Sequence, residues 1–257
     1  MKILLRNLIG LAVFLLIWEA AARTGLVPAQ FLPPPSIVLV RMVELLGDQA
    51  FLRDVIASVL AWAIALLISV AVAVPAGLLL GSVPAIRVAT RSIVEFLRPI
   101  PSVALIPLVL LVIGGGPEAK ITLAVYAAVW PILYNTIYAL DEIDPLLLET
   151  ARAYGTSRVR QLTSVALPHA APFVYTGIRL SATIALILVV STEYLAGASR
   201  GIGNFILEAS SGGGRIDLVL AGTVVAGIIG FVINDGMERL GNRWFRWNAA
   251  TSGAVRA

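Results

Sequence analysis

The stretch ETARAYGTSRVRQLTSVALP, residues 149–168, is a polar segment with three arginines between two strongly apolar parts of the chain. Just before it, Asp144 and Pro145 predict a helix start, because aspartate caps a free amide and proline fits the first helical position. Gly155 fits the left-handed position that often follows a helix end. We therefore expect two short helices that meet in a sharp bend at Gly155, the second ending at Pro168.

Both predicted helices carry an apolar stripe. Leu147, Ala151 and Tyr154 share one face of the first at helical spacing, and Val159 and Leu162 belong to the stripe of the second. Short isolated helices are only marginally stable in water. These two must pack either against the rest of the chain or against a soluble partner, and the residues themselves leave both alternatives open.

The composition is that of a membrane protein. Of the 257 residues, 59% are hydrophobic and only 13% are charged, whereas soluble domains carry about 25% charged residues. The absence of cysteine and the single histidine exclude disulfides, thiol catalysis and clusters of cysteine or histidine around a metal. The net charge of +4 comes largely from arginines that flank apolar runs, so it indicates membrane orientation rather than nucleic-acid binding.

Six runs approach the roughly 20 apolar residues that a membrane span needs. The sequence therefore predicts an all-α integral membrane protein in which residues 1–257 form one membrane domain. Glu19 argues against the alternative that the first run is a cleaved signal peptide. No internal repeat is visible, which weakens the case for a secondary transporter built from inverted repeats. The predicted spans are residues 8–22, 55–80, 100–113, 121–140, 173–195 and 216–233.

The distribution of lysine and arginine predicts the orientation. With the N-terminus placed inside, twelve of these residues lie on the inner side and six on the outer side, while Arg179 lies within the fifth span. Because positive residues favour the cytoplasmic side, we expect both termini and residues 144–168 to be cytoplasmic.

The segment ETARAYG, with LP twelve residues after its glycine, resembles the EAA motif of ABC-importer permeases. Glu149, Ala151, Gly155 and the pair Leu167–Pro168 match the motif, and Thr150 replaces one small residue by another. Two longer segments are similar to the nitrate/sulfonate/taurine permease family. Within the first of them, GGGPEAK departs from the family's usual GIGETSK, so we assign no site to GGGPEAK. These segments are FLRPIPSVALIPLVLLVIGGGPEAKI and GIRLSATIALILVVSTEYLAGASRGIGNFI.

The resemblance implies a type I ABC-importer permease fold in the bacterial inner membrane. It implies that residues 144–168, Arg158 among them, couple the permease to a cytoplasmic ATPase. It also implies a homodimer with two ATPase subunits and a periplasmic or lipid-anchored solute-binding protein. The imported solute would be a small anion such as a sulfonate, taurine or nitrate. The chain has no G-x-x-x-x-G-K-[ST] motif, so we expect no enzyme activity and no bound cofactor or metal, with ATP bound by the partner subunit.

Ionisable residues within spans are candidates for function. Arg179 and Glu193 lie about 21 Å apart along one helix at about 1.5 Å per residue, too far to pair. Glu193, Asn135, Gly201 and Gly203 are candidates for a translocation path or gate. The alternative for Glu193 is snorkelling or hydration at the interface, and for Asn135 we favour a hydrogen bond to a neighbouring helix. A tight site for a small anion would need positive side chains. Because we expect no lysine in the spans, and their one arginine, Arg179, lies toward the cytoplasmic end, we expect solute selectivity to reside mainly in the binding protein.

Two other classes of function remain at this stage. A secondary transporter would need ion ligands inside the membrane, for which only Glu193 offers itself. A membrane enzyme would need clustered histidine, aspartate, glutamate or cysteine side chains, and the sequence shows no such cluster.

Overall fold

The computed structural model describes residues 2–28, 30–197 and 200–246, and every regular element in them is a helix. The elements are α1 (Lys2–Arg23), α2 (Pro35–Gly47), α3 (Gln49–Ser82), α4 (Pro84–Leu97), η1 (Ser102–Leu105), α5 (Ile106–Ile113), α6 (Pro117–Asp141), α7 (Pro145–Ala153), α8 (Arg158–Gln161), η2 (Leu162–Ala166), α9 (Leu167–Ala196), α10 (Ile202–Ser211) and α11 (Ile216–Trp244).

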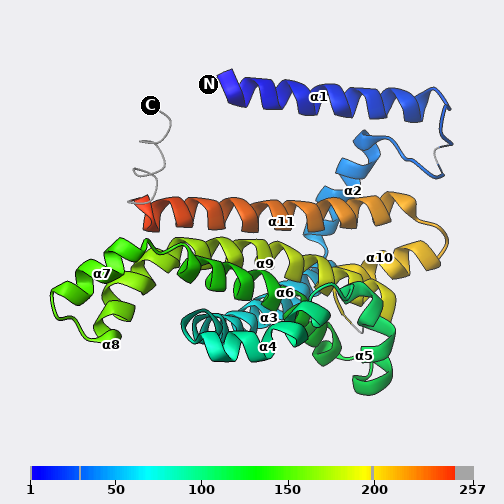
Figure 1. Cartoon of the computed structure of the whole chain (residues 1–257). Helices are drawn as coiled ribbons and strands as arrows, with labels where there is room; N and C mark the ends of the chain where they lie inside the picture. The colour runs from blue at the N-terminus through cyan, green and yellow to red at the C-terminus, as the bar shows by residue number, and fades with distance from the viewer. Residues whose placement is uncertain (1, 29, 198–199, 247–257) are drawn as a thin grey trace.

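The centre of the fold is the packing of α6 against α3 and α9 (Figure 1). Its core is built mainly from alanines of these three helices, including Ala65, Ala124 and Ala185, which are fully buried. Small side chains let membrane helices approach closely, which matters because lipid supplies little hydrophobic drive for helix association. Hydrogen bonds also cross the contacts, since Trp62 Nε1 donates to the Ala182 carbonyl at 2.8 Å and Ser181 Oγ donates to the Ala128 carbonyl.

Four helical stretches among the described residues are long and apolar enough to cross a membrane, and this makes the chain a multi-pass membrane protein. They are Gln49–Ser82, Pro117–Asp141, Val159–Ala196 and Ile216–Trp244. Helix α4 and the segment Ser102–Ile113 are long and apolar enough only when taken together, and the 78° bend between them fits either a broken span or a re-entrant loop. The predicted first span, 8–22, lies within α1, a helix of 22 residues.

The predicted third span, 100–113, is not an independent helix that crosses the membrane. Its α-helical part, α5, has only 8 residues, and it forms the second arm of the bent pair. Pro99 and Pro101 lie at the bend, where they supply no amide hydrogen and so prevent α4 from continuing. The prolines marked the break in the sequence, but the arm before it, Pro84–Leu97, lies outside the predicted spans.

The ends of α7 agree with the sequence prediction. The Asp144 side chain accepts a hydrogen bond from the Leu146 amide at 2.8 Å, and Pro145 opens the helix. Gly155 has φ 70°, and its amide donates to the Arg152 carbonyl while the Thr156 amide donates to the Ala151 carbonyl. These two bonds form a Schellman motif, which requires a residue that tolerates the left-handed conformation.

The prediction that a second short helix ends at Pro168 is wrong. Helix α8 runs through the π-turn η2 into α9, so the backbone is helical from Val159 to Ala196. A proline cannot donate to the carbonyl of the preceding turn. The π-turn directly before it changes the hydrogen-bond spacing there, and Pro168 is accommodated in the first turn of α9.

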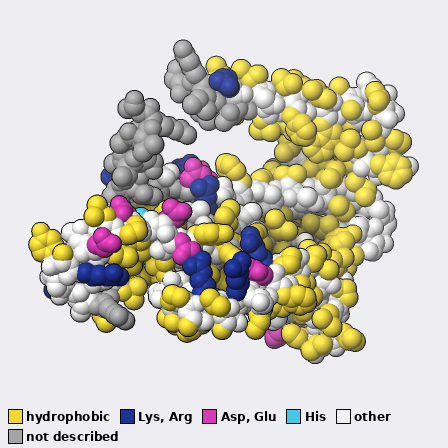
Figure 2. All heavy atoms as spheres, viewed as in Figure 1, with side chains coloured by type: hydrophobic (Ala, Val, Ile, Leu, Met, Phe, Trp, Pro, Cys, Tyr) yellow, Lys and Arg dark blue, Asp and Glu magenta, His cyan; other side chains and the backbone are white. Residues whose placement is uncertain are grey.

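The two ends of the bundle differ in character. Figure 1 shows α7 and α8 at one end, called the α7 end, together with the start of α1 and the last turns of α11. Helices α5 and α10 lie at the opposite end, called the α10 end. On the face drawn in Figure 2, charged side chains gather over the α7 half of the bundle, while the α10 half is mainly hydrophobic or uncharged. The start of α1 and the end of α11 therefore lie on the side of α7.

Candidate functional site

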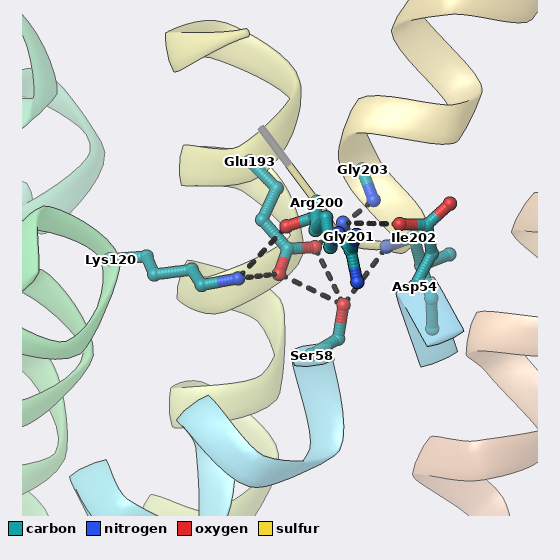
Figure 3. Close-up of polar contacts among 8 residues, drawn as sticks. All are labelled: Asp54, Ser58, Lys120, Glu193, Arg200, Gly201, Ile202 and Gly203. Carbon is teal, nitrogen blue, oxygen red and sulfur yellow. Dashed lines mark hydrogen bonds and ion pairs between the residues drawn. The ribbon is translucent and has the colours of Figure 1, made fainter. Parts of the chain in front are cut away.

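A buried polar cluster lies at the α10 end, where α3, α6 and α9 meet the start of α10 (Figure 3). It consists of Asp54 and Ser58 from α3, Lys120 from α6, Glu193 from α9 and the backbone of residues 200–203, and is called the α10 cluster below. Each side chain comes from a helix that is otherwise largely apolar. The cluster therefore joins four helices through polar contacts in a part of the protein from which water is largely excluded.

Glu193 is the centre of this cluster and is 0% exposed. Its carboxylate accepts hydrogen bonds from Ser58 Oγ at 2.8 and 2.9 Å to its two oxygens, and from the Gly203 amide at 3.1 Å. Lys120 Nζ lies 2.6 Å from Glu193 Oε1. The carboxylate thus has a cationic partner and two neutral donors, as a buried charge requires.

Lys120 is 4% exposed and is held by two acceptors. Besides the bond to Glu193, its ammonium group donates to the Arg200 carbonyl at 3.1 Å. The expectation that the spans contain no lysine is therefore wrong, because α6 begins at Pro117 and buries Lys120 near its start. Lys120 belongs to the segment GGGPEAK, to which the sequence comparison assigned no site.

Close packing of α10 against α9 depends on glycine. A Cβ atom on Gly203 would lie 2.7 Å from both Glu193 Cβ and the Tyr194 nitrogen, and would also overlap the Val190 carbonyl oxygen. A Cβ atom on Gly201 would overlap the Glu193 carboxylate. A larger residue at Gly203 would push α10 away from α9, whereas one at Gly201, where φ is 146°, would strain the backbone and displace the Glu193 carboxylate.

The structure brings three of the four predicted path or gate residues together, namely Glu193, Gly201 and Gly203. The fourth, Asn135, lies elsewhere on α6, where its Nδ2 donates to the Pro131 carbonyl at 2.8 Å and its Cβ packs beside Gly177 of α9. Asp54, Ser58 and Lys120 complete the cluster and were not among the predicted residues.

Arg179, the other ionisable residue of the predicted span 173–195, has its partners on α11. Its Nε donates to Asn234 Oδ1 at 3.0 Å, and its guanidinium forms an ion pair with Glu238 at 2.5 Å. Arg179 and Lys120 are thus both compensated by a carboxylate of another helix. Neither presents an unpaired positive charge.

The predicted coupling residues lie at the α7 end, on α7, at the turn that follows it, on α8 and at the start of α9. Glu149 is exposed on α7, with no ion-pair partner among the described residues. The Ala151 carbonyl accepts both Thr156 Oγ1 and the Thr156 amide, so it holds the turn at Gly155. Leu167 and Pro168 open α9. Arg158 opens α8, and its side chain lies outside the described part of the structure.

The α7 end exposes large apolar side chains. Tyr154 is 84% exposed and Leu147 is 49% exposed, and Leu146 and Val159 are also exposed; these four residues are called the α7 surface. On its other side, α7 borders an open cavity of about 800 Å³ against the ends of α3 and α6, lined in part by Leu148 and Arg152. The segment therefore packs only loosely on the bundle and leaves one apolar surface uncovered.

Comparison with known proteins places this arrangement in a family. The family model described as the inner membrane component of binding-protein-dependent transport systems matches residues 73–243, which include the α7 surface and most of the α10 cluster. The chain belongs to this family.

Individual relatives agree with the assignment. The permease is 31% identical over 243 residues to the taurine transport system permease protein of Escherichia coli, covering 93% of this chain and 88% of the relative. It is 25% identical over 248 residues to the bicarbonate transport system permease protein of Synechocystis, covering 92% and 87%. The fold matches a bacterial ABC transporter involved in alginate import with a TM-score of 0.64 and 20% identity, covering 94% of this chain and 96% of that chain.

Proposed function

We propose that this permease is driven by a cytoplasmic ATPase that docks on residues 144–168 and is joined to them through the α7 surface. Glu149, Ala151, Gly155, Arg158, Leu167 and Pro168 are the proposed coupling residues. In this proposal the permease itself hydrolyses nothing and holds no cofactor. ATP is bound by two copies of the partner, and the motion of the partner is passed to α9 through the continuous helix that begins in α8.

The observation that carries the proposal is the uncovered α7 surface beside a fixed turn. Large apolar side chains on a short helix favour a protein partner, and the Schellman motif at Gly155 holds them in one arrangement. The backbone is helical without a break from Val159 to Ala196, so movement of a docked partner would be transmitted directly to the bundle. Of the two alternatives left open by the sequence, the soluble partner is thereby favoured.

The docking test uses Leu147→Asp combined with Tyr154→Asp. If these side chains are buried against the ATPase, each contributes about 1.5–3 kcal/mol, so we expect co-purification of the ATPase subunit to fall by about tenfold or more. The matched control is Leu26→Asp, a residue that is 82% exposed in the loop after α1. Unchanged co-purification with the double variant would remove the proposed docking site.

The orientation and assembly belong to the same proposal. We infer six spans, with α1 as the first and with both termini and α7 in the cytoplasm, because only that orientation presents α7 to a cytoplasmic ATPase. The lysine and arginine side chains over the α7 half in Figure 2 support it through the positive-inside preference. A second copy of the chain and a periplasmic or lipid-anchored binding protein would complete the importer. The docking test also tests the orientation, since an outward α7 could not bind the ATPase.

The proposed solute is a small anion such as a sulfonate, taurine or nitrate, as the taurine and bicarbonate relatives favour. Arg179 and Lys120 are neutralised by Glu238 and Glu193, so neither is free to form a tight anion site, which would need unpaired donors. We infer that solute choice lies mainly in the binding protein. A secondary transporter is disfavoured because the Glu193 carboxylate, the ion ligand that the sequence offers for one, already accepts hydrogen bonds from protein donors.

A further inference from the structure

We propose that Glu193 and Lys120 are a positioning pair that fixes α10 to the bundle. In this proposal the Glu193 carboxylate caps the N-terminus of α10 from a neighbouring helix, and Lys120 compensates the buried charge. The pair therefore neither binds the solute nor senses an ion. The proposal goes beyond the coupling function, because it concerns the opposite end of the molecule.

The start of α10 has no cap of its own. The residue before the helix is Gly201, which has no side chain that could accept the first amide hydrogens. The first amides of a helix need acceptors, and leaving them unpaired when buried is costly. Buried residues at this start, Ile202 among them, exclude water as a substitute.

Acceptors for these amides come from two other helices. The Gly201 amide donates to Asp54 Oδ1 at 3.1 Å and the Ile202 amide donates to Ser58 Oγ at 2.9 Å. The Gly203 amide donates to Glu193 Oε2 at 3.1 Å. Figure 3 shows all three acceptors converging on residues 201–203. A carboxylate at this place also gains from the positive end of the helix dipole.

The ionised carboxylate needs a further partner because it is fully buried. A single buried charge is strongly unfavourable unless it is paired and hydrogen-bonded. Lys120 supplies the opposite charge at 2.6 Å, and its second bond to the Arg200 carbonyl ties α6 to the segment that leads into α10. Because Glu193 is 0% exposed and each of its oxygens already has a protein donor, the carboxylate is closed to a solute or ion in this arrangement.

The roles of cap and counter-charge can be separated by substitution. A cap requires an acceptor at position 193, whereas a simple ion pair requires only opposite charges at 120 and 193. Glutamine keeps an amide oxygen that can accept from the Gly203 amide and Ser58 Oγ. Lysine at 193 would have donors only and would face the donors of α10.

The experiment compares three permeases in complex with the ATPase: Lys120→Met, Lys120→Met with Glu193→Gln, and the charge-reversed Lys120→Glu with Glu193→Lys. We measure binding-protein-dependent uptake per inserted permease. We also measure labelling of a single cysteine introduced at Ile202, which is fully buried and whose backbone bond is unaffected by the change. The natural permease has no cysteine, so labelling of the permease chain, measured separately from the ATPase subunit, reports only this site.

We expect Lys120→Met alone to lower uptake by about tenfold or more and to make the cysteine reactive, because it leaves a buried unpaired carboxylate. The neutral pair should return uptake to within a few-fold of the parent and protect the cysteine. The charge-reversed pair should do neither. Co-purification of the ATPase should stay unchanged in all three, which separates this proposal from the coupling proposal.

Two results would overturn the positioning role. Recovery of uptake by the charge-reversed pair would show that opposite charges alone suffice. A neutral pair that stays inactive while its cysteine is protected, or that fails to accumulate in the membrane, would show that the charges themselves are required.

Discussion

Gly155→Pro should uncouple the permease from its ATPase while leaving it in the membrane. Proline is restricted to φ near −65°, whereas Gly155 adopts φ 70° and donates its amide to the Arg152 carbonyl. Both features are lost, at a cost of about 1–3 kcal/mol for the strained backbone alone. We expect ATPase co-purification to fall by roughly 5- to 150-fold, the range that such energies produce. Uptake should fall at least as far.

The control for this prediction is Gly155→Asn. Asparagine tolerates the left-handed conformation and keeps the amide hydrogen, and nothing lies within 4 Å of the position of the new Cβ atom. The asparagine variant should therefore support near-normal co-purification. If Gly155→Pro retained both the ATPase and uptake, the turn after α7 would have no part in coupling.

Gly203→Val should prevent α10 from packing on α9. Its Cβ atom would lie 2.7 Å from Glu193 Cβ and the Tyr194 nitrogen and would overlap the Val190 carbonyl. Overpacking of a well-packed site costs about 1–3 kcal/mol or more. Displacement of α10 would also break the hydrogen bond from the residue 203 amide to Glu193. We expect a lower melting temperature of the purified permease and uptake reduced by about tenfold or more.

Gly227→Val is the matched control, since Gly227 lies within α11 and has no heavy atom within 4 Å of a new Cβ. It should change the melting temperature little. Equal effects of the two substitutions would show that close packing at Gly203 is not what holds α10.

The sequence predicted the parts of the fold that depend on local rules. The cap at Asp144, the left-handed Gly155 and the apolar residues of the long helices all follow from short-range chemistry, and the structure agrees with them. The prediction failed at Pro168 and in the third span, because the response of a helix to proline depends on the turns around it. The π-turn before Pro168 allows the helix to continue through it, whereas α4 has no such turn and ends before Pro99.

The α10 cluster could be predicted only in part. Gly201, Gly203 and Glu193 stood out in the sequence, but their partners Ser58 and Lys120 are 135 and 73 positions from Glu193. Single polar residues on separate helices give no spacing signal. One clue was available: Lys120 is the only lysine besides Lys2. It lies just before the predicted span 121–140, and Glu193 lies near the end of the predicted span 173–195, so the sequence predicts that both are close to the same side of the membrane. Matching such lone charges across predicted spans would have indicated the pair.

The most direct test of the central claim is uptake into proteoliposomes that contain the permease and its ATPase subunit, with the binding protein supplied outside. We predict uptake that needs ATP, the ATPase subunit and the binding protein together, and that changes its solute when a binding protein of different specificity from a related importer replaces the first. Uptake by the permease alone, driven by an ion gradient and without ATP, would contradict the account.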